Sequence, residues 1–152
     1  MIQKRSIIDP GLYEADETAW LEAMSELIEQ GRFDELDYEH LGEYLSDMAK
    51  RDRREVESRL TVLIAHLLKW THQRKRRTRN WRTTILVQQR ELVRAIGSDG
   101  VLRNHAESYL PSAFRDAVKE AMSETGLPKI KFPSECPYTV SELMSADIPD
   151  AQ

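Results

Sequence analysis

Apolar residues recur along the chain at intervals of three and four positions, which is the spacing of one face of an α-helix. No stretch alternates apolar and polar residues in a way that predicts a half-buried strand; the nearest case, residues 60–64, lies inside a longer helical pattern. The first periodic stretch predicts a helix from about Asp16 to Gln30, with Gly31 at its C-terminal cap. The apolar face of this helix comprises Trp20, Leu21, Met24, Leu27 and Ile28.

A second periodic stretch predicts one long helix from Tyr38 to about His72, with Asp37 as its N-terminal cap. The stretch contains no proline, and a charged run from Lys50 to Glu55 interrupts its apolar face. A straight helix of this length measures about 52 Å, whereas a compact domain of 152 residues has a diameter of about 40 Å. We therefore expect the helix to bend near residues 50–55, to protrude, or to be covered by a second subunit.

The rest of the chain predicts three further helical elements. A basic link, residues 73–80, leads to a helix near Trp81–Ile96, and a longer helical region, Val101–Glu124, is expected to break or kink at Pro111. Residues 127–137 are rich in proline, and Thr139 can cap a short last helix over Val140–Met144. The expected fold is all-α. It is a single-domain helical bundle of about four main helices with one long helix, an N-terminal extension (1–11) and a proline-rich C-terminal segment (127–152).

Length and amino-acid composition exclude several classes of protein. A length of 152 residues is typical of one domain. The single cysteine excludes an internal disulfide framework and a zinc site built from cysteines. No apolar run approaches the roughly 18 residues of a membrane span, and no apolar signal core follows the basic N-terminus, so we expect a cytoplasmic protein without a membrane partner. Nothing in the sequence indicates a cofactor.

Charge is distributed unevenly along the chain. The formal net charge is −4, but residues 50–94 hold 14 basic and 4 acidic residues, a local charge of +10. The remaining residues carry a net charge of −14. The densest part is the basic segment, which we define as residues 74–82; it has six cations in nine residues and no acid. Its cations are Arg74, Lys75, Arg76, Arg77, Arg79 and Arg82.

Two interpretations of the basic segment remain open. Clustered guanidinium groups pair with phosphates and release counterions, and the flanking Trp70 and Trp81 could stack on unpaired bases, so nucleic-acid binding is one of them. In the other interpretation the cations fold against acidic residues of the same chain, and both tryptophans are core residues. The isoelectric point of about 5.6 favours the second interpretation, because nucleic-acid-binding domains are usually basic.

A second cluster of candidate residues lies on the long predicted helix. His66, Trp70 and Gln73 recur on one of its faces, at intervals of four and three residues. A buried imidazole in this setting could hold an anion or transfer a proton, or it could be a core histidine hydrogen-bonded to a carbonyl or a carboxylate. With residues from the same helix and from the following link and helix, the candidate ligand or anion pocket comprises Arg59, His66, Trp70, Gln73, Arg77 and Trp81.

Other signals for catalysis or metal binding are weak. His66 and His72 are six residues apart and diverge on a helix, and His40 and His105 have no local partner ligands, so we predict no metal site. Cys136 is best interpreted as a small apolar residue in a docked loop. The chain has neither a glycine-rich phosphate loop nor a nucleophile elbow, so we assign no catalytic residue and do not favour an enzyme.

Several blocks of the sequence resemble one known family. The most specific block is residues 57–70, and it continues in residues 77–85, with Gln89 and Arg90 beyond. Other matching blocks are residues 12–16, 20–22, 32–37, 125–128, 132–133 and 136–139. In this order, over about Leu12 to Ile148, they resemble the bacterial domain-of-unknown-function family number twenty-nine. At Arg74 the chain departs from similar proteins, which often have proline there. The resemblance implies a small all-α fold and no particular activity.

Three classes of function remain open. The first is a protein-interaction or scaffold module, whose partner is another protein or, in a homodimer, a second copy of the chain. The second is nucleic-acid binding through residues 74–82. The third is an enzyme or a small-anion site around His66. We favour the first class, and the acidic isoelectric point argues against the second.

Overall fold

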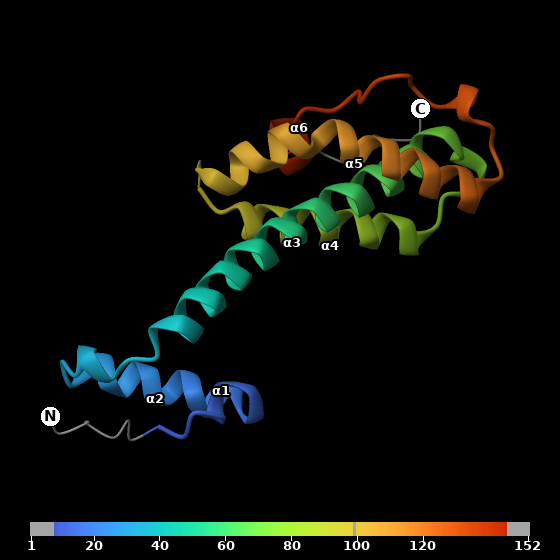
Figure 1. Ribbon diagram of the computed structural model, residues 1–152. Helices are drawn as coiled ribbons and strands as arrows, with labels where there is room; N and C mark the ends of the chain where they lie inside the picture. Colours follow the sequence, from blue (N-terminus) through green and yellow to red (C-terminus); the bar gives the residue numbers. More distant parts are fainter. Residues whose placement is uncertain (1–7, 99, 146–152) are drawn as a thin grey trace, which may run out of the picture. The chain divides into compact units, whose positions relative to one another are not determined.

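A computed structural model describes residues 8–98 and 100–145, and within these ranges the chain forms helices and no strand. The predicted all-α class with four main helices is therefore confirmed (Figure 1). The expected N-terminal extension up to residue 7, the turn residue Asp99 and the end of the chain from residue 146 lie outside the described residues. No helix of the described part is both long and apolar enough to cross a membrane.

The chain divides into two compact units, Met1–Ala49 (unit 1) and Lys50–Gln152 (unit 2). The boundary falls within one helix, α3 (Tyr38–His72), which continues through the charged run at residues 50–55 without interruption. Because that run supplies no apolar surface, the buried core of each unit ends on its own side of it. The predicted bounds of this helix are confirmed.

Unit 1 is built around helix α2 (Glu17–Glu29). This helix starts within one residue of the predicted position, and Asp16 is its N-terminal cap: the Asp16 carboxylate accepts a hydrogen bond of 3.0 Å from the backbone N–H of Ala19. Trp20, Met24 and Leu27, at helical spacing, form the buried core of the unit. The other elements of unit 1 are α1 (Leu12–Ala15), which the pattern does not predict, the 3-10 turn η1 (Phe33–Glu35) and the first turns of α3.

Unit 2 is a helical bundle with one continuous core. The second part of α3 lies beside α4 (Arg79–Ile96) and α5 (Val101–Thr125) in Figure 1, and side chains of all three form one buried cluster. The short helix α6 (Val140–Ser145) adds Val140 and Leu143 to this cluster, and Phe132 adds its ring from the preceding segment. The other elements of unit 2 are the 3-10 turns η2 (Arg74–Arg76) and η3 (Lys129–Lys131).

The largest differences from the predicted helices of unit 2 concern the start of α4 and the interior of α5. Helix α4 begins two residues earlier, because the Thr78 hydroxyl accepts a hydrogen bond from the backbone N–H of Trp81 and so caps the helix at Thr78. Helix α5 is not broken at Pro111, which lies inside it. Ala106 before the proline and Ala113 after it are both fully buried in the core, so packing holds both halves of α5 in place despite the missing N–H.

Candidate functional site

His66, the centre of the predicted pocket, is half-buried on α3 and both of its ring nitrogens have partners. Burial is the main cause that lowers the pKa of His66 below its ordinary value, so the ring is neutral at neutral pH. Its Nδ1 therefore donates to the carbonyl oxygen of Val62 at 2.9 Å, and its Nε2 lies 3.4 Å from the Nζ of Lys69. The imidazole is thus held in one tautomer.

Lys69 is the buried charge beside His66, and it is not among the residues predicted for the pocket. Its side chain is only 3% exposed and its ammonium group forms an ion pair with Glu124 of α5. The same ammonium group lies 5.2 Å from the centre of the Trp81 ring, within the range of a cation–π interaction. Lys69 thereby links α3, α4 and α5, because each of its partners comes from a different helix.

Arg77 and Trp70 form a second contact among the predicted residues. The guanidinium carbon of Arg77 lies 4.4 Å from the centre of the Trp70 ring, and its Nε donates to the Trp70 carbonyl oxygen at 2.8 Å. The Nη1 atom of Arg77 is buried and has no hydrogen-bond partner among the described residues. Arg77 therefore points inward and fastens the basic segment to the end of α3.

The other two predicted pocket residues make separate contacts. Arg59 donates to the side-chain oxygen of Gln88 at 3.2 Å and pairs with Glu55 at 3.6 Å. Gln73 precedes η2 and lines an open surface hollow of about 410 Å³ formed by residues 71–75. The contacts thus group His66 with Lys69 and Trp81, Trp70 with Arg77, and Arg59 with Gln88.

The remaining cations of the basic segment lie on the surface. Arg74, Lys75, Arg76, Arg79 and Arg82 are all exposed, unlike Arg77. Within the described part of the chain, Lys75, Arg76, Arg79 and Arg82 form no ion pair with an acidic side chain. A surface with several unneutralised guanidinium groups in a short stretch attracts phosphates.

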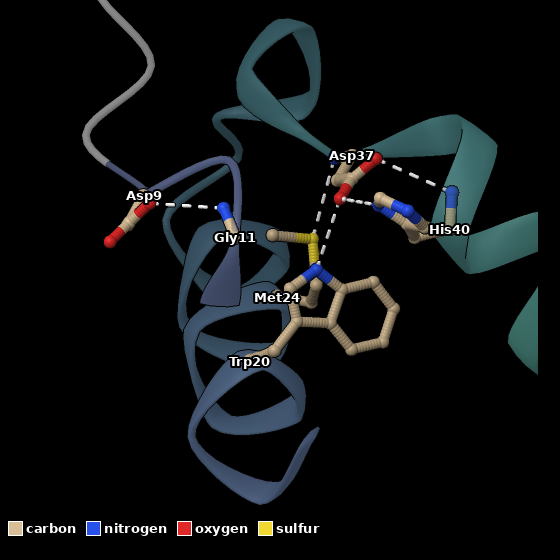
Figure 2. Close-up of polar contacts among 6 residues, drawn as sticks. All are labelled: Asp9, Gly11, Trp20, Met24, Asp37 and His40. Atoms are coloured by element: carbon tan, nitrogen blue, oxygen red, sulfur yellow. Dashed lines mark hydrogen bonds and ion pairs between the residues drawn. The ribbon is translucent and has the colours of Figure 1, made fainter. Parts of the chain in front are cut away.

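Unit 1 contains a polar array around Asp37, of which only the helix cap was predicted (Figure 2). One oxygen of Asp37 accepts from the backbone N–H of His40 at 3.3 Å, which is the predicted cap of α3. Its other oxygen lies 2.6 Å from the Nδ1 of His40 and accepts from the Trp20 indole N–H at 3.2 Å. Tyr13 stacks on the His40 ring at a centroid distance of 4.3 Å. Asp37 therefore ties α2 to the start of α3.

This array lies at the wall of a surface cavity of about 380 Å³ within unit 1. Four of the lining residues are acidic, so the cavity favours cations over anions. No group of side chains that could hold a metal ion occurs among the described residues. The lining residues are Ile8, Asp9, Pro10, Asp34, Glu35, Leu36, Asp37 and His40.

The Asp37–His40 pair predicts how the stability of unit 1 depends on pH. The hydrogen bond to Asp37 raises the pKa of His40 above its ordinary value of 6.5. Protonated His40 therefore stabilises the folded unit fully below pH 6.5, and this stabilisation is lost as the pH rises through the raised pKa of His40. Burial would raise the pKa of Asp37, but hydrogen bonds from His40 and Trp20 lower it below 3.8. The ionised Asp37 carboxylate therefore stabilises the folded unit fully above pH 3.8, and this stabilisation is lost in stronger acid. We expect unit 1 to be most stable between pH 3.8 and pH 6.5.

Urea unfolding followed by the NMR signal of the Trp20 indole N–H would test this pH dependence. The urea midpoint of unit 1 should fall when the pH is raised from just below 6.5 to mildly alkaline values. The variant His40→Gln should abolish most of that fall, because glutamine does not titrate. An equal fall in His40→Gln would show that other groups cause the pH dependence.

Comparison with known proteins identifies the family of the chain but no activity. The model of the family described as "Domain of unknown function DUF29" matches residues 12–148, nearly the whole chain. This match confirms the resemblance found in the sequence. No curated protein and no solved structure matches the chain.

Proposed function

We propose that this chain, which belongs to the DUF29 family, binds nucleic acid through the basic segment. The family description names no activity, so the proposal is argued from the residues of the chain itself. The observation that carries this proposal is the exposure of Lys75, Arg76, Arg79 and Arg82, none of which has an ion-pair partner within the described residues. Unpaired guanidinium and ammonium groups at this density bind phosphates and release the counterions that surround a nucleic acid.

The division of the chain into two units removes the main argument against nucleic-acid binding. By sequence, unit 1 carries 13 acidic and 3 basic residues, a net charge of −10, whereas unit 2 carries 19 basic and 13 acidic residues, a net charge of +6. The acidic isoelectric point of the whole chain therefore originates in unit 1. Unit 2, which contains the basic segment, has the positive charge that is usual for a nucleic-acid-binding domain.

Local structure also favours phosphate binding at the basic segment. Arg79 and Arg82 lie in the first turn of α4, whose unpaired backbone N–H groups add partial positive charge. That first turn contains no acidic residue. The inward contacts of Arg77 hold the segment against α3, so its backbone does not have to be ordered on binding.

Binding to short DNA and RNA, titrated from low to physiological salt, tests the proposal. The triple variant Lys75→Ala, Arg76→Ala, Arg79→Ala should weaken binding at least about tenfold at low salt and reduce the slope of log affinity against log salt by about 2 to 3. The matched control is Lys119→Ala, Lys129→Ala, Lys131→Ala, which removes the same charge from exposed positions elsewhere in unit 2. The control should bind like the unmodified protein.

Two outcomes would contradict the proposal. One is the absence of binding by the unmodified protein even at low salt. The other is an equal loss in the triple variant and its control, because that result would reflect net charge and not the basic segment. Circular dichroism of both variants should show unchanged helix content, since all the replaced side chains are exposed.

A protein-interaction module is the second candidate function, and unit 1 supports it. Among the described residues of this small unit, four large apolar side chains are exposed, namely Ile28, Phe33, Tyr38 and Leu45. Exposed apolar groups of this kind occur at protein interfaces. The charge of −10 opposes the pairing of two copies of unit 1, so a basic partner protein fits better than a homodimer. A solution mass of one chain would argue against the homodimer.

The third class, an enzyme or small-anion site around His66, has weaker support. A general base or an anion ligand needs a ring nitrogen that can face its substrate. Val62 and Lys69 already occupy the two nitrogens of His66. The contacts favour a structural role for this histidine.

A further inference from the structure

The exposed face of α4 continues the basic segment along the helix. With successive residues about 100° apart, the exposed arginines Arg79, Arg82, Arg90 and Arg94 fall within a stripe about 120° wide. Thr83, Leu86 and Val93 lie in the same stripe, and Leu86 and Val93 are 49% and 39% exposed. We call these seven residues the α4 stripe; it contains no acidic residue.

The opposite side of α4 is fixed in the protein, which gives the stripe a definite orientation. Ile85, Leu92 and Ile96 are buried in the core of unit 2, about 120° around the helix from the centre of the stripe. The only acidic residue of α4, Glu91, flanks the stripe and lies 3.8 Å from Arg90 and 3.5 Å from Arg94. Both arginines are largely exposed, so these pairs are weak and a phosphate or a base can compete with them.

We propose that the α4 stripe is a reading face for duplex DNA, on which α4 enters the major groove with its arginines and Leu86 toward the bases. This inference rests on the proposed nucleic-acid binding and extends it to a substrate class. An 18-residue helix is about 27 Å long, and the major groove of B-DNA, about 12 Å wide, admits one helix. Arginine binds guanine with two hydrogen bonds, and apolar side chains contact the methyl group of thymine.

The position of Trp81 favours a duplex over a single strand. Single-strand binding surfaces present exposed aromatic rings on which bases stack. The α4 stripe contains no aromatic residue, and Trp81 lies roughly on the opposite side of the helix, partly buried, with the ammonium group of Lys69 near its ring. Duplex RNA is a poorer fit as well, because its major groove is too deep and narrow for a helix.

The arrangement of charges favours DNA over an anionic membrane. A helix that lies on a membrane has a continuous apolar face with its cations on the opposite, polar side. The α4 stripe differs, because guanidinium groups lie on both sides of Leu86 and Val93. Arg82 lies on one side of these two residues, and Arg79 and Arg90 lie on the other. Burying this face in lipid would bury guanidinium groups with it.

Two variants outside the basic segment test the inference. Arg90→Ala with Arg94→Ala should weaken binding to random-sequence duplex DNA about tenfold, whereas Arg115→Ala with Lys119→Ala, an equal loss of exposed charge on α5, should leave it unchanged. Arg90→Lys with Arg94→Lys keeps the charge but not the two-pronged geometry. This double lysine variant should retain affinity for random-sequence duplexes within about threefold. In a selection from a random duplex library, it should lose the sequence enrichment that the unmodified protein gives.

The outcomes separate this inference from the proposed function. If the unmodified protein binds no nucleic acid at low salt, the proposed function and the reading face on α4 are both wrong. If the Lys75, Arg76, Arg79 variant loses binding but the Arg90, Arg94 variant binds like its control, the reading face is wrong and the proposed function stands. Tighter binding to single strands, or binding to phosphatidylglycerol vesicles without binding to duplex DNA, would also overturn the inference.

Discussion

Replacing Trp20 with alanine is expected to unfold unit 1. The side chain is 0% exposed and is the largest of the three residues that form the buried core of that unit. It also donates to Asp37 and packs edge-on against Tyr13 at 4.7 Å. Truncation of a buried tryptophan costs about 3–5 kcal/mol, and a unit of about 50 residues has little stability in reserve.

Hydrogen exchange measured by mass spectrometry on the full chain would test this prediction. In Trp20→Ala the amides of α2 should lose protection, while those of α4 and α5, which belong to the core of unit 2, should keep it. Phe33→Ala is the matched control, because it removes an aromatic ring of unit 1 that is 55% exposed, and it should change little. Full protection of α2 in Trp20→Ala would refute the assigned core.

Replacing Arg77 with alanine is expected to destabilise unit 2 by about 2–3 kcal/mol, through the loss of a charged hydrogen bond and a shielded cation–π contact. Its Nε donates to Trp70 at 2.8 Å and its guanidinium group lies over the same ring. The neighbouring Arg76 is exposed and has no ion pair among the described residues, so Arg76→Ala should change stability by less than about 0.5 kcal/mol. Adjacent arginines of one segment thus have different roles.

Chemical unfolding followed by circular dichroism would measure both variants, and nucleic-acid binding would be measured on the same samples. Arg76→Ala should weaken binding and leave the unfolding midpoint in place, whereas Arg77→Ala should lower the midpoint. Arg77→Lys should recover little of the lost stability, because an ammonium group reproduces neither the planar stack nor the directed hydrogen bond. Equal stability of Arg76→Ala and Arg77→Ala would contradict the inward role of Arg77.

Hydrophobic periodicity was sufficient to predict most of the helices. The bounds Tyr38–His72 agree with α3, and the predicted caps at Asp37 and Thr139 are both present. These features depend on neighbours within a few residues, so local sequence contains the information. Pro111 is the exception, because its local preference is outweighed by packing of α5 on both sides of it.

The contacts around the candidate sites were harder to predict. An Asp followed three residues later by His at the start of a helix could have suggested the Asp37–His40 pair, but the Trp20 indole reaches Asp37 from another helix, 17 positions away in sequence. Lys69 interrupts an apolar run between Leu68 and Trp70, which could have marked it as buried. Its partner Glu124 is 55 positions away in sequence, beyond any local pattern.

By itself, then, the sequence determined the all-α class, the long helix, the family and the place of the densest positive charge. Only the tertiary structure decided that the acidic residues 1–49 and the basic residues 50–152 form separate units, that Arg77 points inward, and that the arginines of α4 share one exposed face with Leu86. The physical reason is the separation along the chain between the residues that interact. Helix formation follows from side chains three or four positions apart, whereas burial and the neutralisation of a charge depend on contacts between residues that are distant along the chain.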